Sequence, residues 1–201
     1  MSINVCNDRS MASITSLPSG VSGSSLVLLE TQTASSSATI SFTSNIDSTY
    51  KEYIFKFIDV HPANDGVFLT FQADTGTNTN YNQTITSTHF TAYHFEDGSS
   101  TGLSYITGGD QAQGSSFQRA SQQIGNDNDQ ALSGTLHIFN PASTTFVKHF
   151  IATTNQAGFE NRSVNSFIAG YFNTTTALTR VRFKMSSGNI DAGTITLYGI
   201  N

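Results

Sequence analysis

Charged residues are scarce in this chain. Only 11% of its 201 residues are Asp, Glu, Lys or Arg, whereas an average globular domain has about 25%. The formal net charge is −5, and the nine Lys and Arg residues are spread along the chain. Because nucleic-acid binding needs a positively charged footprint, the sequence argues against a nucleic-acid partner.

Cysteine, tryptophan and long apolar runs are also lacking. The single Cys6 excludes an internal disulfide and a cysteine-rich zinc site. No apolar run approaches 18 residues, so we expect no membrane insertion. Residues 1–9 lack the apolar core of a secretory signal peptide, so we expect the protein to be made and kept in a cytoplasm, or exported only as part of a larger assembly.

Small polar residues are abundant instead. Ser, Thr and Asn make up about a third of the chain, well above their usual share. Hydrophobic residues account for 37% of the chain and include 15 Phe. Disordered chains combine few aromatic residues with high net charge, so this composition predicts a folded protein with a lean core.

The chain divides into a polar segment and one domain. Residues 1–24 are rich in Ser, Gly and Asn and show no helical periodicity. We interpret them as an extended N-terminal arm or linker, and residues 25–201 as a single domain. An arm of this composition needs a partner surface to hold it, so we expect it to dock on another protein.

Short apolar and aromatic runs separated by Gly, Asn, Asp and Ser indicate about ten β-strands. The predicted strands are residues 26–31, 39–43, 50–60, 67–71, 89–95, 136–139, 146–151, 167–172, 178–185 and 194–198. Without helical periodicity, such a pattern predicts an all-β protein with a single β-sandwich, and a jelly roll is the favoured form. The weakest β region is 108–132, in which residues 117–124 suit a short helix.

Two strands give more specific expectations. In 178–185, Val181, Phe183 and Met185 fall on one face, and the basic residues Arg180, Arg182 and Lys184 fall on the other. The basic face suits solvent, or contact with an acidic neighbouring subunit. In 194–198, we expect Ile195 and Leu197 to point into the core.

The strand predicted at 50–60 is apolar on both faces. Tyr53, Phe55 and Phe57 share one face, while Ile54, Ile58 and Val60 share the other. A partner sheet covers only one face of a sandwich strand. The second face therefore needs cover from the 108–132 loop or from another subunit, and we favour the subunit because exposed apolar patches usually mark interfaces.

No motif in the sequence supports an enzyme. Residues 98–102 (GSSTG) have the spacing of a hydrolase nucleophile elbow. That elbow needs a helix after the serine, and here a strand-like run follows. The scattered carboxylates form no pair typical of a glycosidase. We therefore assign no catalytic residues and no cofactor.

Two groups of residues are weak candidates for metal binding. Asp127 and Asp129 lie in an Asn- and Asp-rich loop that supplies part of a calcium ligand set. The same residues favour an ordinary turn, which is the preferred interpretation. His137 and His149 lie on the arms of a predicted hairpin, but two histidines do not complete a zinc site. Cross-strand packing of the two rings is the simpler hypothesis.

Four segments resemble a family of β-sandwich proteins from tailed bacteriophages, and the similarity spans about residues 11–200. The segments are SITSLPSG (13–20), LVLLETQTASSSATISFTSNIDSTYKEYIFKF (26–57), IGNDNDQALSGTLHIFNPASTTFVKHF (124–150) and KMSSGNIDAGTITLYGI (184–200). The GTITLYGI ending and the SGTLHIFNP block are the most specific parts. The family is regarded as virion structural, with members in head decoration, head fibres or tail fibres, and it implies no catalytic residues.

The resemblance implies a non-enzymatic subunit on the exterior of a phage particle, assembled in the host cytoplasm. Capsid decoration or a head fibre is the favoured place. The alternative is a tail fibre or receptor-binding protein that recognises a host surface glycan or protein. The implied partners are other virion proteins, and a homotrimer is the expected oligomer because related fibres are commonly threefold.

Overall fold

A computed structural model of the protein describes residues 26–200. This part of the chain is all-β, with twelve strands and no helix. The strands are β1 (Leu26–Thr33), β2 (Ile40–Phe42), β3 (Glu52–Pro62), β4 (Leu69–Thr75), β5 (Ile85–Phe95), β6 (Thr101–Tyr105), β7 (Gln118–Arg119), β8 (Leu132–Phe139), β9 (Lys148–Gly158), β10 (Arg162–Phe172), β11 (Leu178–Met185) and β12 (Ile190–Ile200). Accordingly, residues 26–200 contain no helix of the length and apolarity that a membrane span requires. The predicted arm, residues 1–24, lies outside the described residues.

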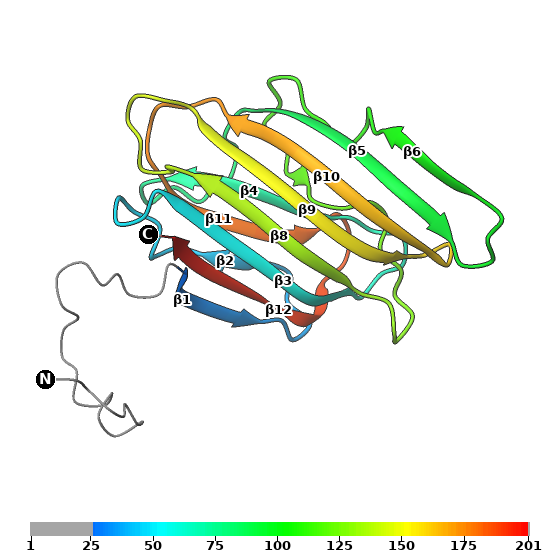
Figure 1. The fold of residues 1–201 in the computed structure, drawn as a ribbon. Coiled ribbons are helices and arrows are strands. Elements are labelled where there is room, and N and C mark those ends of the chain that lie inside the picture. The colour runs from blue at the N-terminus through cyan, green and yellow to red at the C-terminus, as the bar shows by residue number, and fades with distance from the viewer. Residues whose placement is uncertain (1–25, 201) are drawn as a thin grey trace, which may run out of the picture.

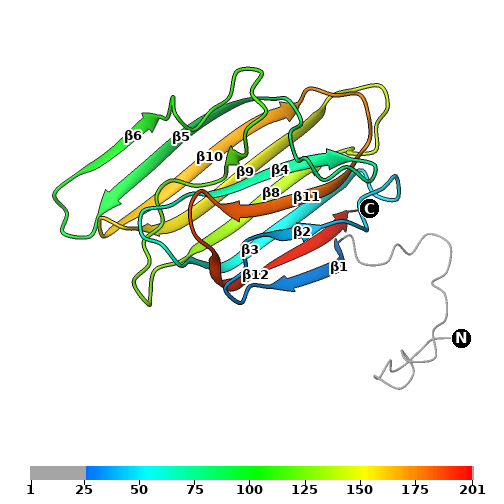
Figure 2. The ribbon, with the colours of Figure 1, turned by 180° about the vertical axis from the view of Figure 1, so that it is seen from behind.

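The strands form two antiparallel sheets that pack face to face (Figures 1 and 2). The large sheet has the order β1-β12-β3-β8-β9-β10-β5-β6, and the small sheet has the order β2-β11-β4-β7. Within them, β1-β12-β3-β8 faces β2-β11-β4-β7, which is the strand order of a jelly roll. Strands β5, β6, β9 and β10 extend the large sheet beyond the small one. The structure therefore confirms the predicted β-sandwich.

Aromatic side chains fill the space between the sheets. Phe55 and Phe57 of β3 meet Phe183 of β11 edge-on, with ring centroids 5.2 and 5.4 Å apart. Phe71 of β4 meets Phe150 of β9 in the same way, at 5.2 Å. This geometry suits aromatic rings, which prefer edge-to-face contacts over stacking without offset. The predicted inward faces of 178–185 and 194–198 are confirmed, because Val181, Phe183, Met185, Ile195 and Leu197 are all buried.

A β-bulge in β3 changes one predicted face. The pairing of β3 with β8 shifts register between Phe57 and Val60, and Asp59 adopts a left-handed φ of 49°. The extra residue turns Val60 into the core, where it is fully buried. The prediction that Val60 shares the outer face with Ile54 and Ile58 is therefore wrong.

The loop that joins β6 to β8 packs on the inner face of the large sheet. Its short strand β7 pairs with β4, and Thr154 of β9 donates a hydrogen bond to the carbonyl of Ala120 at 2.6 Å. The expected short helix at residues 117–124 is therefore wrong. Of the two alternatives for cover of the outer face, the 108–132 loop is excluded, because it packs on the inner face. Among residues 26–200 no other segment covers that face over its exposed apolar side chains, and Ile58 there is 48% exposed.

Candidate functional site

Where the small sheet ends, the layer beneath the large sheet becomes polar. The β6–β8 loop replaces the second sheet here, and it faces inward-pointing residues of β5, β9 and β10. The buried polar residues of this layer are Ser87, His89, Thr91, Gln118, Ser121, Thr154, Gln156 and Ser166. The backbone of an irregular loop has N–H and C=O groups that need hydrogen-bond partners. Polar side chains on the facing strands can supply these partners. Gln118, for example, donates to the carbonyl of Gly109 at 2.7 Å and accepts from the hydroxyl of Ser87 at 2.6 Å.

His89 lies fully buried in this layer. Burial, together with the nearby charge of Arg119, lowers the pKa of its imidazole to about 4, so the ring is neutral near pH 7. Neither ring nitrogen makes a hydrogen bond of good geometry among the described residues, although the backbone of Gly109 interacts with the ring and partly offsets the lowering of its pKa. Gly109 runs directly over the ring, and a Cβ at that position would lie 2.2 Å from Nδ1. Glycine is therefore required there for the loop to approach the sheet.

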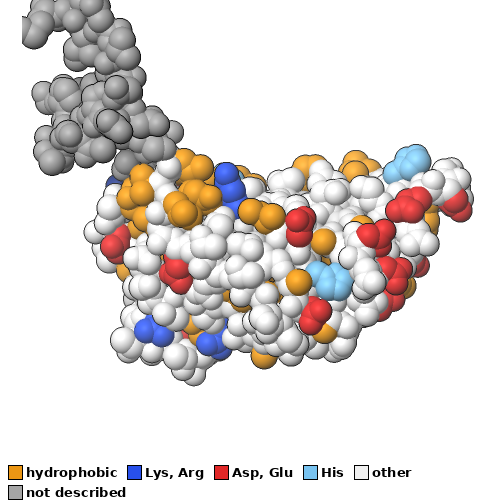
Figure 3. Space-filling model, turned by 90° about the horizontal axis from the view of Figure 1, so that it is seen from below, with side chains coloured by type: hydrophobic (Ala, Val, Ile, Leu, Met, Phe, Trp, Pro, Cys, Tyr) orange, Lys and Arg blue, Asp and Glu red, His pale blue; other side chains and the backbone are white. Residues whose placement is uncertain are grey.

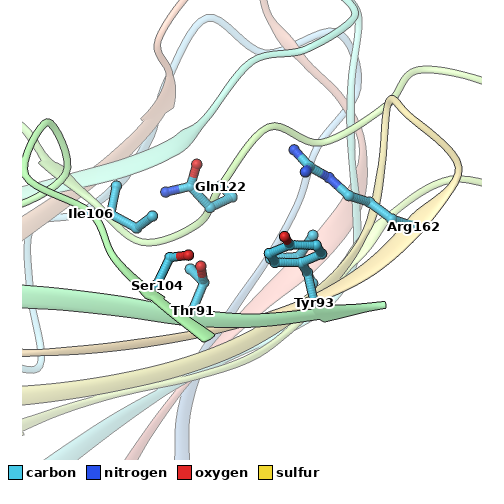
Figure 4. A pocket seen from close by; sticks show the side chains of 7 residues that line it. Thr91, Tyr93, Ser104, Ile106, Gln122 and Arg162 are labelled. Atoms are coloured by element: carbon cyan, nitrogen blue, oxygen red, sulfur yellow. The ribbon is translucent and has the colours of Figure 1, made fainter. Parts of the chain in front are cut away.

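A cavity of about 200 Å³ opens at the far end of the polar layer (Figure 4). The sheet supplies its floor and the loop supplies its roof. Its lining residues are Thr91 and Tyr93 from β5, Ser104 from β6, Arg162 and Val164 from β10, and Ile106 and Gln122 from the loop. The strand register explains the floor, because Thr91 pairs with Ser104 and Tyr93 pairs with Val164.

The wall formed by Arg162 is held by its neighbours. Its guanidinium lies 2.9 Å from the carboxylate of Glu160 and 5.6 Å from the centre of the Tyr93 ring. The Tyr93 ring in turn lies against Gly102 of β6, where a Cβ would come within 2.8 Å of it. Arg162 also lines a second cavity of about 240 Å³ with His94 and Glu96. A glycine, an aromatic ring and a carboxylate thus fix the guanidinium at the edge of the first cavity.

The outer face of the large sheet is a second candidate site. Phe90 of β5 and Phe167 of β10 stack there with centroids 5.0 Å apart, and Ile151 of β9 lies on the same face and is 49% exposed. Phe90, Ile151 and Phe167 line a shallow apolar cavity of about 200 Å³. A larger apolar hollow of about 510 Å³ is lined by Phe139 and Phe146. We call the set Phe90, Phe139, Phe146, Ile151 and Phe167 the outer apolar band.

Charge is distributed unevenly around these two sites. Figure 3 shows Asp and Glu side chains gathered toward one end of the molecule, on the right of the view. The turns that join β5 to β6 and β9 to β10 lie at that end in Figure 1 and carry Glu96, Asp97 and Glu160. The basic face of β11 is only half buried: Arg182 lies over the ring of Tyr81, and Lys184 lies over the ring of Phe117.

The predicted site residues lie apart from the cavity. Asp127 belongs to a turn in which its carbonyl accepts from Gln130 at 2.8 Å, and its N–H donates to the Gln130 side chain. Within residues 26–200 no three His, Cys, Asp or Glu side chains come together as a metal site, so calcium binding at Asp127 and Asp129 stays a prediction. Residues 98–102 span the end of the β5–β6 turn and the first two residues of β6, so a strand rather than a helix follows.

His137 and His149 share the outer face but do not face each other. The predicted hairpin is confirmed, with β8 and β9 antiparallel. In its register His137 is opposite Ile151, and its ring hydrogen-bonds Glu52 of β3. His149 instead contacts the ring of Tyr171, at 5.9 Å. The hypothesis that the two rings pack on each other is wrong, because the long hairpin loop offsets them by two residues.

Sequence reasoning missed the cavity. Arg162 and Gln122 lie in polar segments that carry no apolar pattern, and Ser104 lies in the strand-like run after residues 98–102, which gives no sign of a cavity. A usable signal was present in β5, where Ser87, His89 and Thr91 occupy alternate positions. Alternate residues of a strand share one face, so these three polar residues indicate that one face of β5 is polar. Only the structure shows that this face is buried. Comparison of the chain with family models, curated proteins and solved structures finds no match.

Proposed function

We propose that the protein is a non-enzymatic structural subunit on the exterior of a tailed phage particle, in capsid decoration or in a head fibre. The observation that carries this proposal is the outer apolar band. An eight-stranded sheet with one face open and aromatic needs cover, and large exposed apolar patches mark interaction surfaces. The resemblance supports the same proposal, and its segments 26–57, 124–150 and 184–200 include β1, β2, β8 and β12 of the jelly roll.

The partners follow from that surface. We propose that other virion proteins or further copies of this chain cover the outer apolar band, and that the oligomer is a homotrimer. The jelly roll supports this role, since it forms a stable domain without disulfides, and residues 26–200 contain none of the cysteine that a disulfide needs. Assembly takes place in the host cytoplasm, and the assembled subunit lies on the virion exterior.

Quantitative mass spectrometry of purified particles tests the proposal. A shell protein is expected in hundreds of copies per particle and a tail fibre in a few to tens. Copy numbers in the hundreds support capsid decoration, whereas a few to tens of copies favour the alternative. Absence of the chain from particles that retain full infectivity would overturn the virion assignment altogether.

The alternative is a receptor-binding protein, and one observation favours it. The cavity beside Arg162 is lined by hydroxyl, amide and guanidinium groups at an exposed end of the sandwich. Ligand sites combine concave shape with a few convergent polar groups. A glycan on the host surface offers such groups a matching set of hydroxyls.

A further inference from the structure

We infer that the cavity lined by Gln122 and Arg162 binds a single neutral sugar residue. The inference deepens the receptor-binding alternative and rests on it only for the source of the sugar. The cavity itself is a property of the fold, formed where the β6–β8 loop crosses the inner face of β5, β6 and β10 (Figure 4).

Unpaired donors in the cavity wall carry the first step. Gln122 Nε2 and Arg162 Nε are buried and have no hydrogen-bond partner among residues 26–200. Native proteins pair the large majority of their buried side-chain polar atoms. Both nitrogens are shielded from solvent, so a ligand oxygen in the cavity reaches them only after the Gln122 or Arg162 side chain shifts. Such a shift would pair groups that folding alone leaves unpaired.

The charge balance of the cavity favours a neutral ligand. The Arg162 guanidinium already pairs with Glu160 at 2.9 Å, so an anion gains little further attraction from it and would be repelled by the carboxylate. The remaining polar groups are the hydroxyls of Thr91, Tyr93 and Ser104. Each hydroxyl both donates and accepts, which matches the hydroxyls of a sugar.

The size of the cavity and its apolar walls restrict the range of possible ligands further. A cavity of about 200 Å³ lies below the range of about 300–1,000 Å³ typical of drug-sized ligands, so one ring fits and a longer ligand must extend outward. Ile106 and Val164 supply the only aliphatic side chains of the lining. They offer contact to the C–H face of a pyranose ring while the polar groups bind its hydroxyls.

Saturation-transfer NMR with the full chain tests the inference directly. The probes are the methyl glycosides of glucose, galactose, mannose and N-acetylglucosamine, together with methyl glucuronide, each at about 10 mM because single-sugar sites are weak. We expect at least one neutral glycoside to bind and the glucuronide to bind more weakly. The inference is overturned by absence of binding for all four neutral glycosides, or by binding of the glucuronide alone.

Variants separate this site from the rest of the surface. Ser104→Phe fills the cavity from an exposed position on β6, and Gln122→Met removes the amide donor at similar size; each is expected to weaken binding at least tenfold. The matched control Leu103→Phe changes the neighbouring residue, whose side chain points to the opposite face of the sheet and is 73% exposed. It should leave binding unchanged. Equal binding by Ser104→Phe and the unaltered protein would place the sugar elsewhere and refute the site.

Glu160→Gln provides an independent readout of the charge argument. Without the Glu160 carboxylate, no negative charge balances the Arg162 guanidinium. The binding preference should therefore shift toward methyl glucuronide by several fold. An unchanged preference contradicts the neutral-ligand argument. These binding results do not depend on particle mass spectrometry, so failure of the virion assignment and failure of the sugar site are distinguishable.

Discussion

Leu197 shows how a single residue can fix the register of the last strand. It lies fully buried on the inner face of β12, opposite Phe55 of β3. Replacing a fully buried leucine with alanine leaves a cavity, so Leu197→Ala is expected to lower the free energy of unfolding by about 2–5 kcal/mol. Urea denaturation measures the change. A loss below about 1 kcal/mol would place the side chain at the surface.

His89 makes stability depend on pH. Its pKa is about 4 in the folded protein and about 6.5 in an unfolded chain, so the unfolded state binds more protons between these values. The stability that the neutral His89 ring contributes is therefore fully present above pH 6.5, and it is lost as the pH drops toward 4. From pH 7 to pH 5 this one group lowers the free energy of unfolding by about 2 kcal/mol.

Denaturation of His89→Leu at both pH values isolates the contribution of His89. The variant carries no titrating group at this position, so it should lose about 2 kcal/mol less between pH 7 and pH 5 than the unaltered protein. His94→Gln, on the exposed outer face of the same strand, serves as the control and should keep the original pH dependence. An identical pH slope in His89→Leu would show that the ring is solvated.

Strand pairing in the middle of the large sheet depends on a glycine. Gly134 of β8 lies so close to β9 that a Cβ would come within 2.4 Å of the carbonyl oxygen of Thr153. Backbone cannot yield as a flexible side chain does, so Gly134→Ala is expected to cost about 1–3 kcal/mol of stability. Gly108→Ala has only an ordinary contact at 3.8 Å and should stay within about 0.5 kcal/mol in the same thermal and urea unfolding experiments. Equal stability of the two variants would contradict the close pairing of β8 and β9.

The strands differ in how well the sequence predicts them. The difference depends on whether the inner face of a strand packs against the aromatic core or against the polar loop. Strand β11 is covered by aromatic core, so its alternating Val181, Phe183 and Met185 identify both its span and its inner face. The ends of β5, β9 and β10 face the polar loop instead, and their inward residues include Ser87, Thr154 and Ser166. Such residues look like loop in a sequence, which is why β9 is predicted to end at 151 and extends to Gly158.

The cavity is the least predictable feature for the same reason. Its walls come from strand ends and from a loop whose path depends on tertiary contacts, such as the pairing of β7 with β4. No local pattern places Gln122 beside Arg162, because the two residues meet only after β5, β6 and β10 have formed one surface. The bulge at Asp59 is similar: it arises from the pairing of β3 with its neighbours, and alternation alone assigns Val60 to the wrong face.

At the scale of the whole molecule, the outer apolar band predicts self-association, with a trimer as the expected species. Among residues 26–200, nothing covers the two edges of the large sheet, at β1 and β6, or the broad face that carries the band. Exposed edges also invite pairing between chains, but β6 is only five residues long. The face offers the larger continuous apolar area, so we place the interface there.

Sedimentation velocity of the purified full chain at micromolar concentration decides whether it self-associates, and one variant locates the interface. Ile151 lies near the centre of the band and is half exposed, so Ile151→Arg can keep its charge in solvent in the monomer. In a trimer that buries the band, the same guanidinium would be desolvated without a partner. We therefore expect three-subunit particles for the unaltered protein and monomers for Ile151→Arg, with unchanged circular dichroism. Ser44→Arg, in the exposed loop after β2, is the control and should remain trimeric. A monomeric unaltered protein would refute self-association through this face, and a trimeric Ile151→Arg would move the interface to the strand edges.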